Sequence, residues 1–275
     1  MIVINKKNKF FLSLIFICFC VICNAQTQRF FFIVSMKLDS SLTVKDVTVL
    51  DINKNSCTFY SNEYLKVDSL NKAHNTYKFA YPNFKKIITK KENEDYIFIN
   101  SMSMATYYYP KKIKLKWILS DDKKVIGKFS VQKATTNYGG RKWTAWFTNE
   151  IPLPYGPYIF YDLPGLVLEV YDNANDYHFT FVENKNLLDN VDKENILEKY
   201  LGKNKFEIKL LDWQKILFNY YNNPIPEYKD GNARMVGENG QEYTANDYRE
   251  VEKQIQTKMK RYNNPIELDE KVEFK

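Results

Sequence analysis

The stretch 161–171 most constrains what this chain can fold into, because it joins a turn to the clearest apolar alternation in the sequence. Pro164 and Gly165 suit the two central positions of a type II turn, where proline presets φ and glycine takes positive φ without steric cost. The residues after the turn alternate between an apolar and a mixed set, and the apolar set is Leu166, Leu168 and Val170. This period of two predicts a strand with one face on a core.

The amino-acid composition supports a mainly β protein. The 275 residues include 21 Tyr and 19 Phe against only 9 Gly, and aromatic side chains pack well on pleated surfaces. The length can bury a sizeable core in one or two domains. We expect one domain over residues 26–275, with a β-rich core over 26–183 and a helical C-terminal portion over 184–275.

The first 25 residues have the pattern of a secretory signal peptide. Lysines at positions 6, 7 and 9 precede an apolar run over 10–22 that is interrupted only by Ser13, and Cys23-Asn24-Ala25 supplies small residues for cleavage before Gln26. The run is shorter than the roughly 20 apolar residues of a spanning helix. We therefore expect cleavage after Ala25, no membrane span in the mature chain, and a periplasmic or secreted location. An uncleaved anchor and lipid attachment at Cys20 or Cys23 are the alternatives.

Cleavage would change the cysteine count and the charge. Cys57 alone would remain of four cysteines, so the mature chain could form no internal disulfide. We expect Cys57 to be a buried small hydrophobe, with a reactive or intermolecular thiol as the alternative. Loss of the three leader lysines lowers the net charge from +7 to +4. That charge is too small and too evenly spread to indicate nucleic acid as a partner.

Short strands dominate the first two thirds of the chain. The expected strands are 28–36, 43–52, 57–60, 96–100, 105–109, 113–119, 125–135, 142–148, 166–171 and 177–182. Polar turns separate most of them, as at 120–124, and no helix-length linker intervenes before residue 183. Sequential antiparallel pairing follows. The predicted fold class is α+β, mainly β: a curved, mostly antiparallel sheet or open half-barrel of roughly seven to ten strands, with helices in the C-terminal third.

The hydrophobic period changes after residue 183. Helices are expected at 192–202, from Asp212 to 223, and from Thr244 to Tyr262, with a polar loop near 224–240. Residues 61–73 fit a helix imperfectly and stay undecided. The last helix carries basic residues around an apolar stripe, which would suit a membrane surface. Its acidic residues dilute that charge, so we expect it to pack on the sheet.

An ordered set of short motifs resembles the GLPGLI family of secreted Bacteroidetes proteins. The matching pieces are Lys133-Ala134-Thr135, Gly140-Arg141, Trp143, Trp146-Phe147-Thr148, Glu150-Ile151-Pro152, Gly156-Pro157 and Leu163-Pro164-Gly165-Leu166. Weaker pieces extend the resemblance over most of residues 45–225. The resemblance implies an extracytoplasmic protein of uncharacterised activity, and it supplies no catalytic residues.

Three positions depart from the family pattern. Asp162 stands where the motif has its first glycine, Val167 where it has its last isoleucine, and Ser130 where many members have cysteine. If that glycine has positive φ, aspartate can follow at modest cost, because Asp tolerates the left-handed region better than most residues. Leu163, Pro164, Gly165 and Leu166 are therefore interpreted as a structural corner.

The region around the motif also holds the candidate binding residues. They are Arg141, Trp143, Trp146, Tyr158 and Asp162, chosen because Trp and Arg are enriched where ligands and partners dock and because tyrosines gather nearby. Trp143 and Trp146 differ by three positions, so they are expected on opposite faces of a strand. Core packing on both sides of a curved sheet is the simpler interpretation of that pair.

Catalytic and metal sites have little support in the sequence. His74 and His178 stand far apart with no closely spaced ligand pair, so we expect no metal and no cofactor. No nucleophile motif of the G-x-S-x-G or S-x-x-K type is present. Asp162, Glu169 and Asp172 could act as paired carboxylates, although turn and solvent positions account for them as well.

The sequence therefore predicts an extracytoplasmic binding or accessory protein without enzymatic activity. Its partner would be an apolar ligand, a lipid or a protein of the cell envelope, held in the concave face of the sheet. The alternative is a carboxylate-dependent hydrolase that uses Asp162 and Glu169, which requires those groups to meet in a cleft.

Overall fold

The computed structural model describes residues 27–102, 105–187, 193–202, 204–237 and 240–275. The predicted signal peptide, which contains three of the chain's four cysteines, lies outside the described residues. Asp192, the expected N-cap of a helix, lies outside them as well. Twelve strands of the described part form one open sheet in the order β12-β6-β5-β4-β3-β2-β1-β11-β10-β9-β8-β7. Neighbours are antiparallel except for the short parallel pair of β12 and β6. The predicted fold class is confirmed, with more strands than expected.

The strands have the following bounds: β1 Thr27–Lys37, β2 Thr43–Ile52, β3 Ser56–Ser61, β4 Ile87–Lys91, β5 Tyr96–Met102, β6 Ala105–Lys111, β7 Ile118–Ile126, β8 Phe129–Tyr138, β9 Arg141–Thr148, β10 Leu166–Asp172, β11 Tyr177–Leu187 and β12 Lys205–Glu207. The helices are α2 Glu63–His74, α3 Lys193–Leu201, α4 Leu210–Asn222, α5 Pro226–Lys229 and α6 Ala245–Arg261, followed by the 3-10 turn η1 Leu268–Glu270.

The sheet curls tightly around an aromatic core. Tyr158 contacts Phe98 on β5 with ring centroids 6.0 Å apart, and Phe160 contacts Trp143 on β9 at 4.6 Å. The rings of Tyr158 and Phe160 are themselves 6.4 Å apart. A flat sheet would hold β5 and β9 roughly 34 Å apart, since six strands lie between them and neighbouring strands are about 4.8 Å apart. Only a strongly curved sheet brings both strands onto this one segment.

The concave face is filled by the connection between β9 and β10. In this connection, residues 149–165, the side chains of Tyr158, Ile159, Phe160, Tyr161 and Leu163 are each at most 2% exposed. The Trp117 indole nitrogen donates to the Tyr161 carbonyl at 2.7 Å and helps to hold the connection in place. The concave face, where an apolar ligand was expected, is thus occupied by the chain's own side chains.

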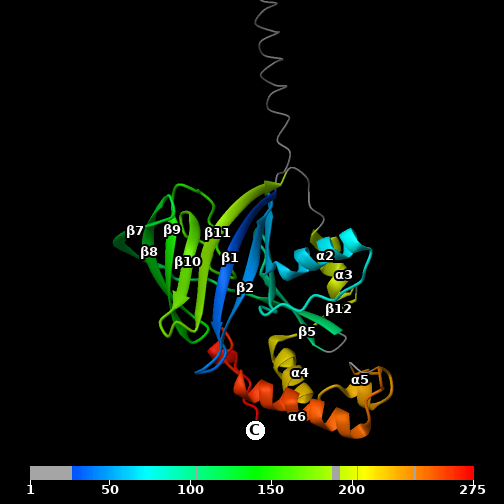
Figure 1. Ribbon diagram of the computed structural model, residues 1–275. Coiled ribbons are helices and arrows are strands. Elements are labelled where there is room, and N and C mark those ends of the chain that lie inside the picture. The colour runs from blue at the N-terminus through cyan, green and yellow to red at the C-terminus, as the bar shows by residue number, and fades with distance from the viewer. Residues whose placement is uncertain (1–26, 103–104, 188–192, 203, 238–239) are drawn as a thin grey trace, which may run out of the picture.

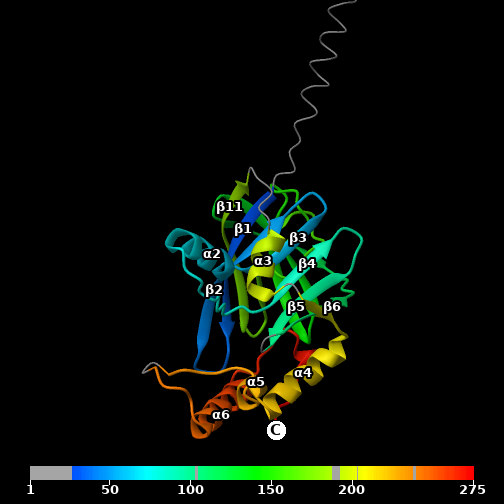
Figure 2. The ribbon, with the colours of Figure 1, turned by 90° about the vertical axis from the view of Figure 1, so that its right-hand side faces the viewer.

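Helices cover a second, smaller core on the convex side. Val49, Tyr60 and Ile87 project from β2, β3 and β4 and pack against Tyr64 of α2 and Leu197 of α3. Figure 2 shows α2 and α3 in front of these strands. The undecided stretch 61–73 is therefore a helix, and the Ser61 hydroxyl accepts a hydrogen bond from the Glu63 amide at its start.

The C-terminal helices lie at one end of the sheet (Figure 1). Helix α6 begins at the N-cap Thr244, whose side chain and that of Asp247 bond reciprocally to each other's backbone amides. It packs against α4 and α5. The expectation that this helix packs on the sheet is therefore wrong, because α4 and α5 supply the surface for its apolar stripe.

Several local predictions are confirmed and others are wrong. The period of two located β1, β2, β3, β5, β6 and β9–β11 within about five residues, whereas β4 and β12 were missed. The expected strand 125–135 is wrong at its start, because it crosses the turn at Gly127 between β7 and β8. The expected strand at 113–119 is wrong, since β7 begins only at Ile118 and runs through the expected turn at 120–124. Edge strand β7 is irregular there, with a register shift between Leu119 and Lys123. Its polar, exposed residues carried no core-facing signal.

The turn at Leu163-Pro164-Gly165-Leu166 differs from the expected type II geometry. Gly165 does not have positive φ; instead, a Cβ there would lie 2.0 Å from the Thr148 carbonyl oxygen. Glycine is needed because the backbones of this corner and of β9 nearly touch. Asp162 has φ of 70°, so the aspartate does adopt the left-handed conformation that was considered for this position.

Candidate functional site

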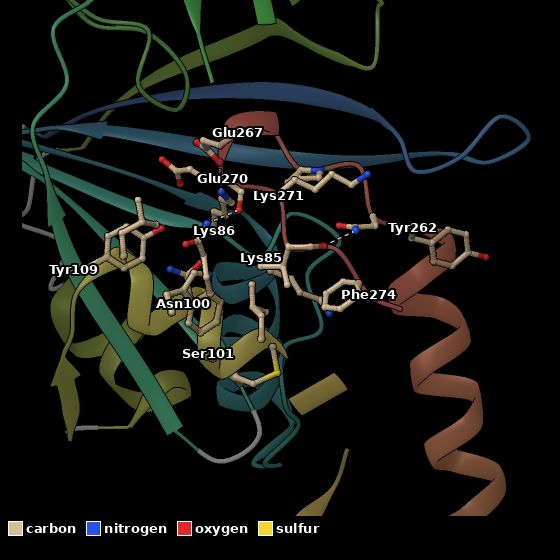
Figure 3. A pocket seen from close by; sticks show the side chains of 18 residues that line it. Lys85, Lys86, Asn100, Ser101, Tyr109, Tyr262, Glu267, Glu270, Lys271 and Phe274 are labelled. Carbon is tan, nitrogen blue, oxygen red and sulfur yellow. Dashed lines mark hydrogen bonds and ion pairs between the residues drawn. The ribbon is translucent and has the colours of Figure 1, made fainter. Parts of the chain in front are cut away.

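A pocket of about 350 Å³ lies where the C-terminal segment, residues 262–275, crosses the ends of β5 and β6. One wall is apolar and comes from α4 and the last residues of the chain: Leu210, Trp213, Leu217, Val272 and Phe274. The opposite wall is polar and comes from the sheet and η1. Figure 3 shows Lys86, Glu267 and Glu270 together at one end, with Asn100 and Tyr109 beside them.

Glu267 is the most deeply buried acidic group of this pocket. Its side chain is 2% exposed and accepts hydrogen bonds from the Lys86 ammonium and from the hydroxyls of Tyr138 and Tyr158. Burial alone would raise the pKa of this carboxyl, but the charge and hydrogen bond of Lys86 and the Tyr158 hydrogen bond hold it below its ordinary value. Glu267 is therefore an ionised group with three internal donors.

The two tyrosines act as donors in this cluster because they stay protonated. Burial first, and then the charge of Glu267, raises the pKa of both Tyr138 and Tyr158. Tyr158 also has φ of 62°, a conformation that is uncommon for a residue with a side chain and that the surrounding contacts must hold. The connection 149–165 is thus strained locally at the point where it meets the carboxylate.

A second ion pair continues the cluster at the edge of the pocket. The Lys111 ammonium donates to the Glu270 carboxylate and lies 3.0 Å from the Tyr138 hydroxyl oxygen. Burial raises the pKa of Glu270, and the Lys111 hydrogen bond and charge only partly oppose this effect. Neighbouring Glu267 and Glu270 therefore have pKa values shifted in opposite directions.

Asn100 is a buried polar group of this pocket that makes no well-formed hydrogen bond through its side-chain nitrogen to the described residues, although its side chain lies close enough to the Tyr109 phenol to affect it. The residue is 7% exposed, and its side-chain nitrogen Nδ2 has no hydrogen-bond partner among the residues that the structure describes. Burial and the charges of Glu267 and Glu270 raise the pKa of the adjacent Tyr109 phenol, an effect that Asn100 opposes. A buried amide without a partner costs free energy that a bound acceptor would recover.

Two glycines and an arginine position the acidic turn in the pocket. Gly139 and Gly140 have positive φ, and a Cβ on Gly139 would lie 3.0 Å from the Glu267 Cα. The Leu268 amide then donates to the Gly139 carbonyl at 2.7 Å. Arg141 holds the same segment through donors to the Ile266 carbonyl and to Asn264 and Pro265.

The predicted binding residues do not gather in one site. Arg141 also pairs with Asp172 and Asp176, both at 2.9 Å, and its side chain is 2% exposed. Trp143 is buried under Phe160, and its indole nitrogen donates to the Tyr138 carbonyl at 3.0 Å. These polar groups are already used within the fold. Of the predicted residues, Arg141 and Tyr158 come closest to the pocket, through their contacts with its C-terminal segment.

Trp146 and Asp162 lie elsewhere. Trp146 points to the face of β9 opposite Trp143, as expected from their spacing, and Lys124 stacks on its ring with Nζ 4.4 Å from the centroid. Its indole nitrogen is buried without a hydrogen-bond partner among the described residues. Asp162 is exposed at the corner before β10.

Glu169 and His178 do meet, on neighbouring strands β10 and β11. His178 Nε2 lies 2.9 Å from a Glu169 carboxylate oxygen, and the Lys124 ammonium donates to the other oxygen. The His178 hydrogen bond is the main cause that lowers the pKa of Glu169. Asp162 and Asp172 are not part of this contact; the Asp172 carboxylate is taken up by Arg141 and by the Tyr177 amide.

Sequence reasoning missed the residues that line the pocket's polar wall. Lys86 and Glu267 are separated by 181 positions, and Lys111 and Glu270 by 159. Neither pair follows a spacing rule that a single sequence displays. The available signal was the adjacent Gly139-Gly140, which indicated a close backbone approach but not what approaches.

The described residues include neither a cluster of metal ligands nor a membrane-spanning helix. No three histidine, cysteine or acidic side chains among them converge as a metal site would require. Likewise, none of the helices in the described ranges combines the length and apolar character needed to span a bilayer. Cys57 is 1% exposed beside the Tyr161 hydroxyl at 3.3 Å, which confirms its predicted burial.

Comparison with known protein families gives a match over a short segment of the chain. A family model described as "Protein of unknown function (Porph_ging)" matches residues 138–169, which include the glycine pair, all of β9, the connection 149–165 and the first part of β10. No curated protein matches the chain.

Two solved structures of PNGF-II, in space groups C2 and P21, are similar in fold. The TM-scores are 0.51 and 0.52 at 16% and 15% sequence identity, over 70% of this chain. The matched part is 32% and 33% of those chains, so this chain spans about a third of their length. At such identity the similarity shows a shared fold alone.

Proposed function

We propose that this chain is an extracytoplasmic, non-enzymatic binding protein for an amphipathic ligand such as a lipid, and that the ligand occupies the pocket at the C-terminal segment. We further propose that it is a member of the GLPGLI family and that it acts after cleavage at Ala25 as a single domain. The motif pieces and the signal pattern support these two points. The match to a family of unknown function over residues 138–169 is compatible with them.

The Asn100 amide nitrogen is the observation that carries this function. It is buried and without a partner among the described residues, at a pocket whose facing wall is apolar. Small-molecule sites combine such apolar walls with few oriented polar groups, in volumes of roughly 300–1,000 Å³. A ligand with an acceptor head near Asn100 and an apolar body against Trp213 and Phe274 satisfies both requirements.

Binding is favoured over catalysis because the charged groups are already neutralised. Glu267 and Glu270 each hold a lysine, and Glu267 also holds two tyrosine hydroxyls. A general base needs a carboxylate free to accept a substrate proton. The groups of this cluster instead fix the pocket wall.

A carboxylate-dependent hydrolase is the second candidate, and the contact of Glu169 with His178 is its support. None of the described pockets includes either residue in its lining. A His178→Ala variant that loses hydrolysis of an ester or glycoside, with unchanged thermal unfolding, would favour this candidate over ligand binding.

Calorimetric titration with dodecanoate tests the binding proposal. Asn100→Leu removes the donor while keeping the side chain's approximate size, and the loss of one hydrogen bond to a charged head should weaken binding about tenfold. Asn173→Leu, on an exposed turn, is the matched control and should bind like the wild type.

Native mass spectrometry of protein purified from its own envelope complements this titration. Co-purified amphipathic mass that Asn100→Leu loses would support the proposal. Absence of such mass, together with dodecanoate binding that is undetectable or equal in wild type and Asn100→Leu, would reject it.

A further inference from the structure

The connection from α2 to β4 exposes a row of aromatic side chains, which is unusual for a folded domain. We call residues 76–82 the aromatic arm. Tyr77, Phe79 and Tyr81 are 61%, 59% and 82% exposed. The arm has no helix or strand and follows α2 as an extended trace (Figure 1). Clustered exposed apolar groups of this kind mark interaction sites more often than single exposed residues do.

The direction of these side chains is set by hydrogen bonds at both ends of the arm. The buried Asn71 side chain accepts from the Lys78 amide at 2.8 Å and donates to the Lys78 carbonyl at 3.0 Å. After the arm, the Phe84 amide donates to Asp46 at 2.8 Å. The backbone is thus held at Lys78 and again just after the arm at Phe84.

The alternation in the arm is the reverse of what burial alone would produce. Ala80 points inward and packs against the convex-side core of Tyr64 and Ile87, while its aromatic neighbours face solvent. In an extended segment on a core, the large apolar residues usually take the inward positions. The small residue inside and the large residues outside indicate that the outer face serves a partner.

The stretch of sequence that contains the arm is positively charged. Residues 69–91 contain six lysines and no aspartate or glutamate. Among these, Lys72, Lys78, Lys85 and Lys91 are exposed. Asp68, the acid just before the stretch, is neutralised by Lys72 and Lys199 at 2.7 and 2.8 Å. A negatively charged partner is therefore the complementary one.

The geometry of the rings distinguishes between anionic partners. Tyr77 and Phe79 meet edge to face, with centroids 5.4 Å apart and planes at 86°. Such a pair does not present two coplanar faces on which successive sugar rings or bases could stack. Amphipathic aromatic rings beside lysines are instead the combination found at membrane interfaces, where rings enter the headgroup region and lysines attract anionic lipids.

We propose that the aromatic arm docks this protein on an anionic lipid surface. The rings of Tyr77, Phe79 and Tyr81 enter the headgroup layer, and the surrounding lysines contact the anionic headgroups. Tyr77, Phe79 and Tyr81 lie outside the lining of the pocket at the C-terminal segment, which includes Lys85 of the surrounding lysines. The proposal therefore does not depend on whether that pocket binds a ligand.

Vesicle sedimentation tests the proposal with the purified protein. The wild type should sediment with vesicles of phosphatidylcholine mixed with an equal part of phosphatidylglycerol, and not with phosphatidylcholine alone. The variant Y77S/F79S/Y81S should bind the mixed vesicles at least about tenfold more weakly, and Lys78→Glu about fivefold or more, since each lysine and each buried ring contributes to the partition. Added salt should weaken wild-type binding.

Two controls make the test specific. I118S/V125S replaces side chains of edge strand β7 that are 70% and 71% exposed, and it should bind like the wild type. All proteins are produced identically, so that any contribution of residues 1–25 is common to them, and thermal unfolding should be unchanged because every altered side chain is exposed.

The proposal is overturned by any of three results. The first is wild-type protein whose sedimentation with vesicles does not increase when phosphatidylglycerol is present. The second is an arm variant that sediments with the mixed vesicles like the wild type. The third is arm-dependent binding to an anionic polysaccharide such as heparin without binding to vesicles, which would assign the arm to a different partner.

Discussion

Replacing Glu267 by glutamine should destabilise the fold strongly, because the cluster around this carboxylate joins three distant parts of the chain. Lys86 precedes β4, Tyr138 ends β8 and Tyr158 lies in the connection 149–165, and all three donate to Glu267. Glutamine has nearly the same shape. It leaves the Lys86 ammonium, whose side chain is 27% exposed, without its counter-ion.

The size of the effect follows from the burial of the two partners. Removal of one partner of a buried ion pair costs about 3–5 kcal/mol, and the partial exposure of Lys86 places the expected loss near the lower end, about 3 kcal/mol. For a chain of this length the melting temperature should fall by roughly 6–12 °C. Urea unfolding at pH 7 measures the same loss as a lower midpoint with an unchanged slope.

The pH dependence gives an independent check on the mechanism. The pKa of Glu267 in the fold lies below its ordinary value of 4.5, so its stabilisation is complete above that pH and is lost as pH falls through the folded pKa. The difference between wild type and Glu267→Gln should therefore shrink below pH 4.5. Glu270→Gln is the matched control. Because burial raises the pKa of Glu270, ionisation of that group opposes folding, and its replacement should cost less than about 1 kcal/mol at pH 7.

Two results would refute this reasoning. One is a Glu267→Gln protein that unfolds within about 0.5 kcal/mol of the wild type at pH 7, the range of ordinary surface substitutions. The other is a difference between the two proteins that stays constant as the pH is lowered to 3. Either result would mean that the ion cluster does not hold the C-terminal segment on the sheet.

Two further substitutions test how the motif region is built. Arg141→Lys keeps the charge but cannot reproduce the five hydrogen bonds of the guanidinium, so we expect a loss of about 2–4 kcal/mol in urea unfolding, and a change below 0.5 kcal/mol would contradict the clamp. Gly165→Ala places a methyl group 2.0 Å from the Thr148 carbonyl oxygen, which only a backbone shift can relieve. We expect at least about 3 kcal/mol of destabilisation or failure to fold; soluble protein with a wild-type melting temperature would show that the corner is looser than described.

The strands and helices were predictable to the extent that burial alternates with their own period. In β9, Trp143, Ala145 and Phe147 face the core and Lys142 and Thr144 do not, and that contrast is visible in the letters themselves. The prediction of β7 failed because β7 is an edge strand with few buried residues. A strand that buries little leaves little hydrophobic pattern to detect.

The candidate site was much less predictable than the fold. Arg141 and Tyr158 were predicted as binding residues, and the structure places them in contact with the C-terminal segment of the chain itself. An arginine that holds two carboxylates and a neighbouring chain segment has the same sequence signature as one that holds a ligand. Asn100, in the middle of an apolar strand, was passed over because an isolated asparagine has no periodicity.

The sequence by itself determined the class of the fold, the presence of a turn before β10 and the burial of Cys57. These features depend on steric preferences and on hydrophobic alternation within short stretches, and both can be read directly from the order of residues. Only the tertiary structure decided that the sheet closes around its own connection, that Glu267 lies between Lys86 and Tyr158, and that the arm faces outward. Those arrangements depend on which distant segments come into contact, and that choice is made by the packing of the whole core.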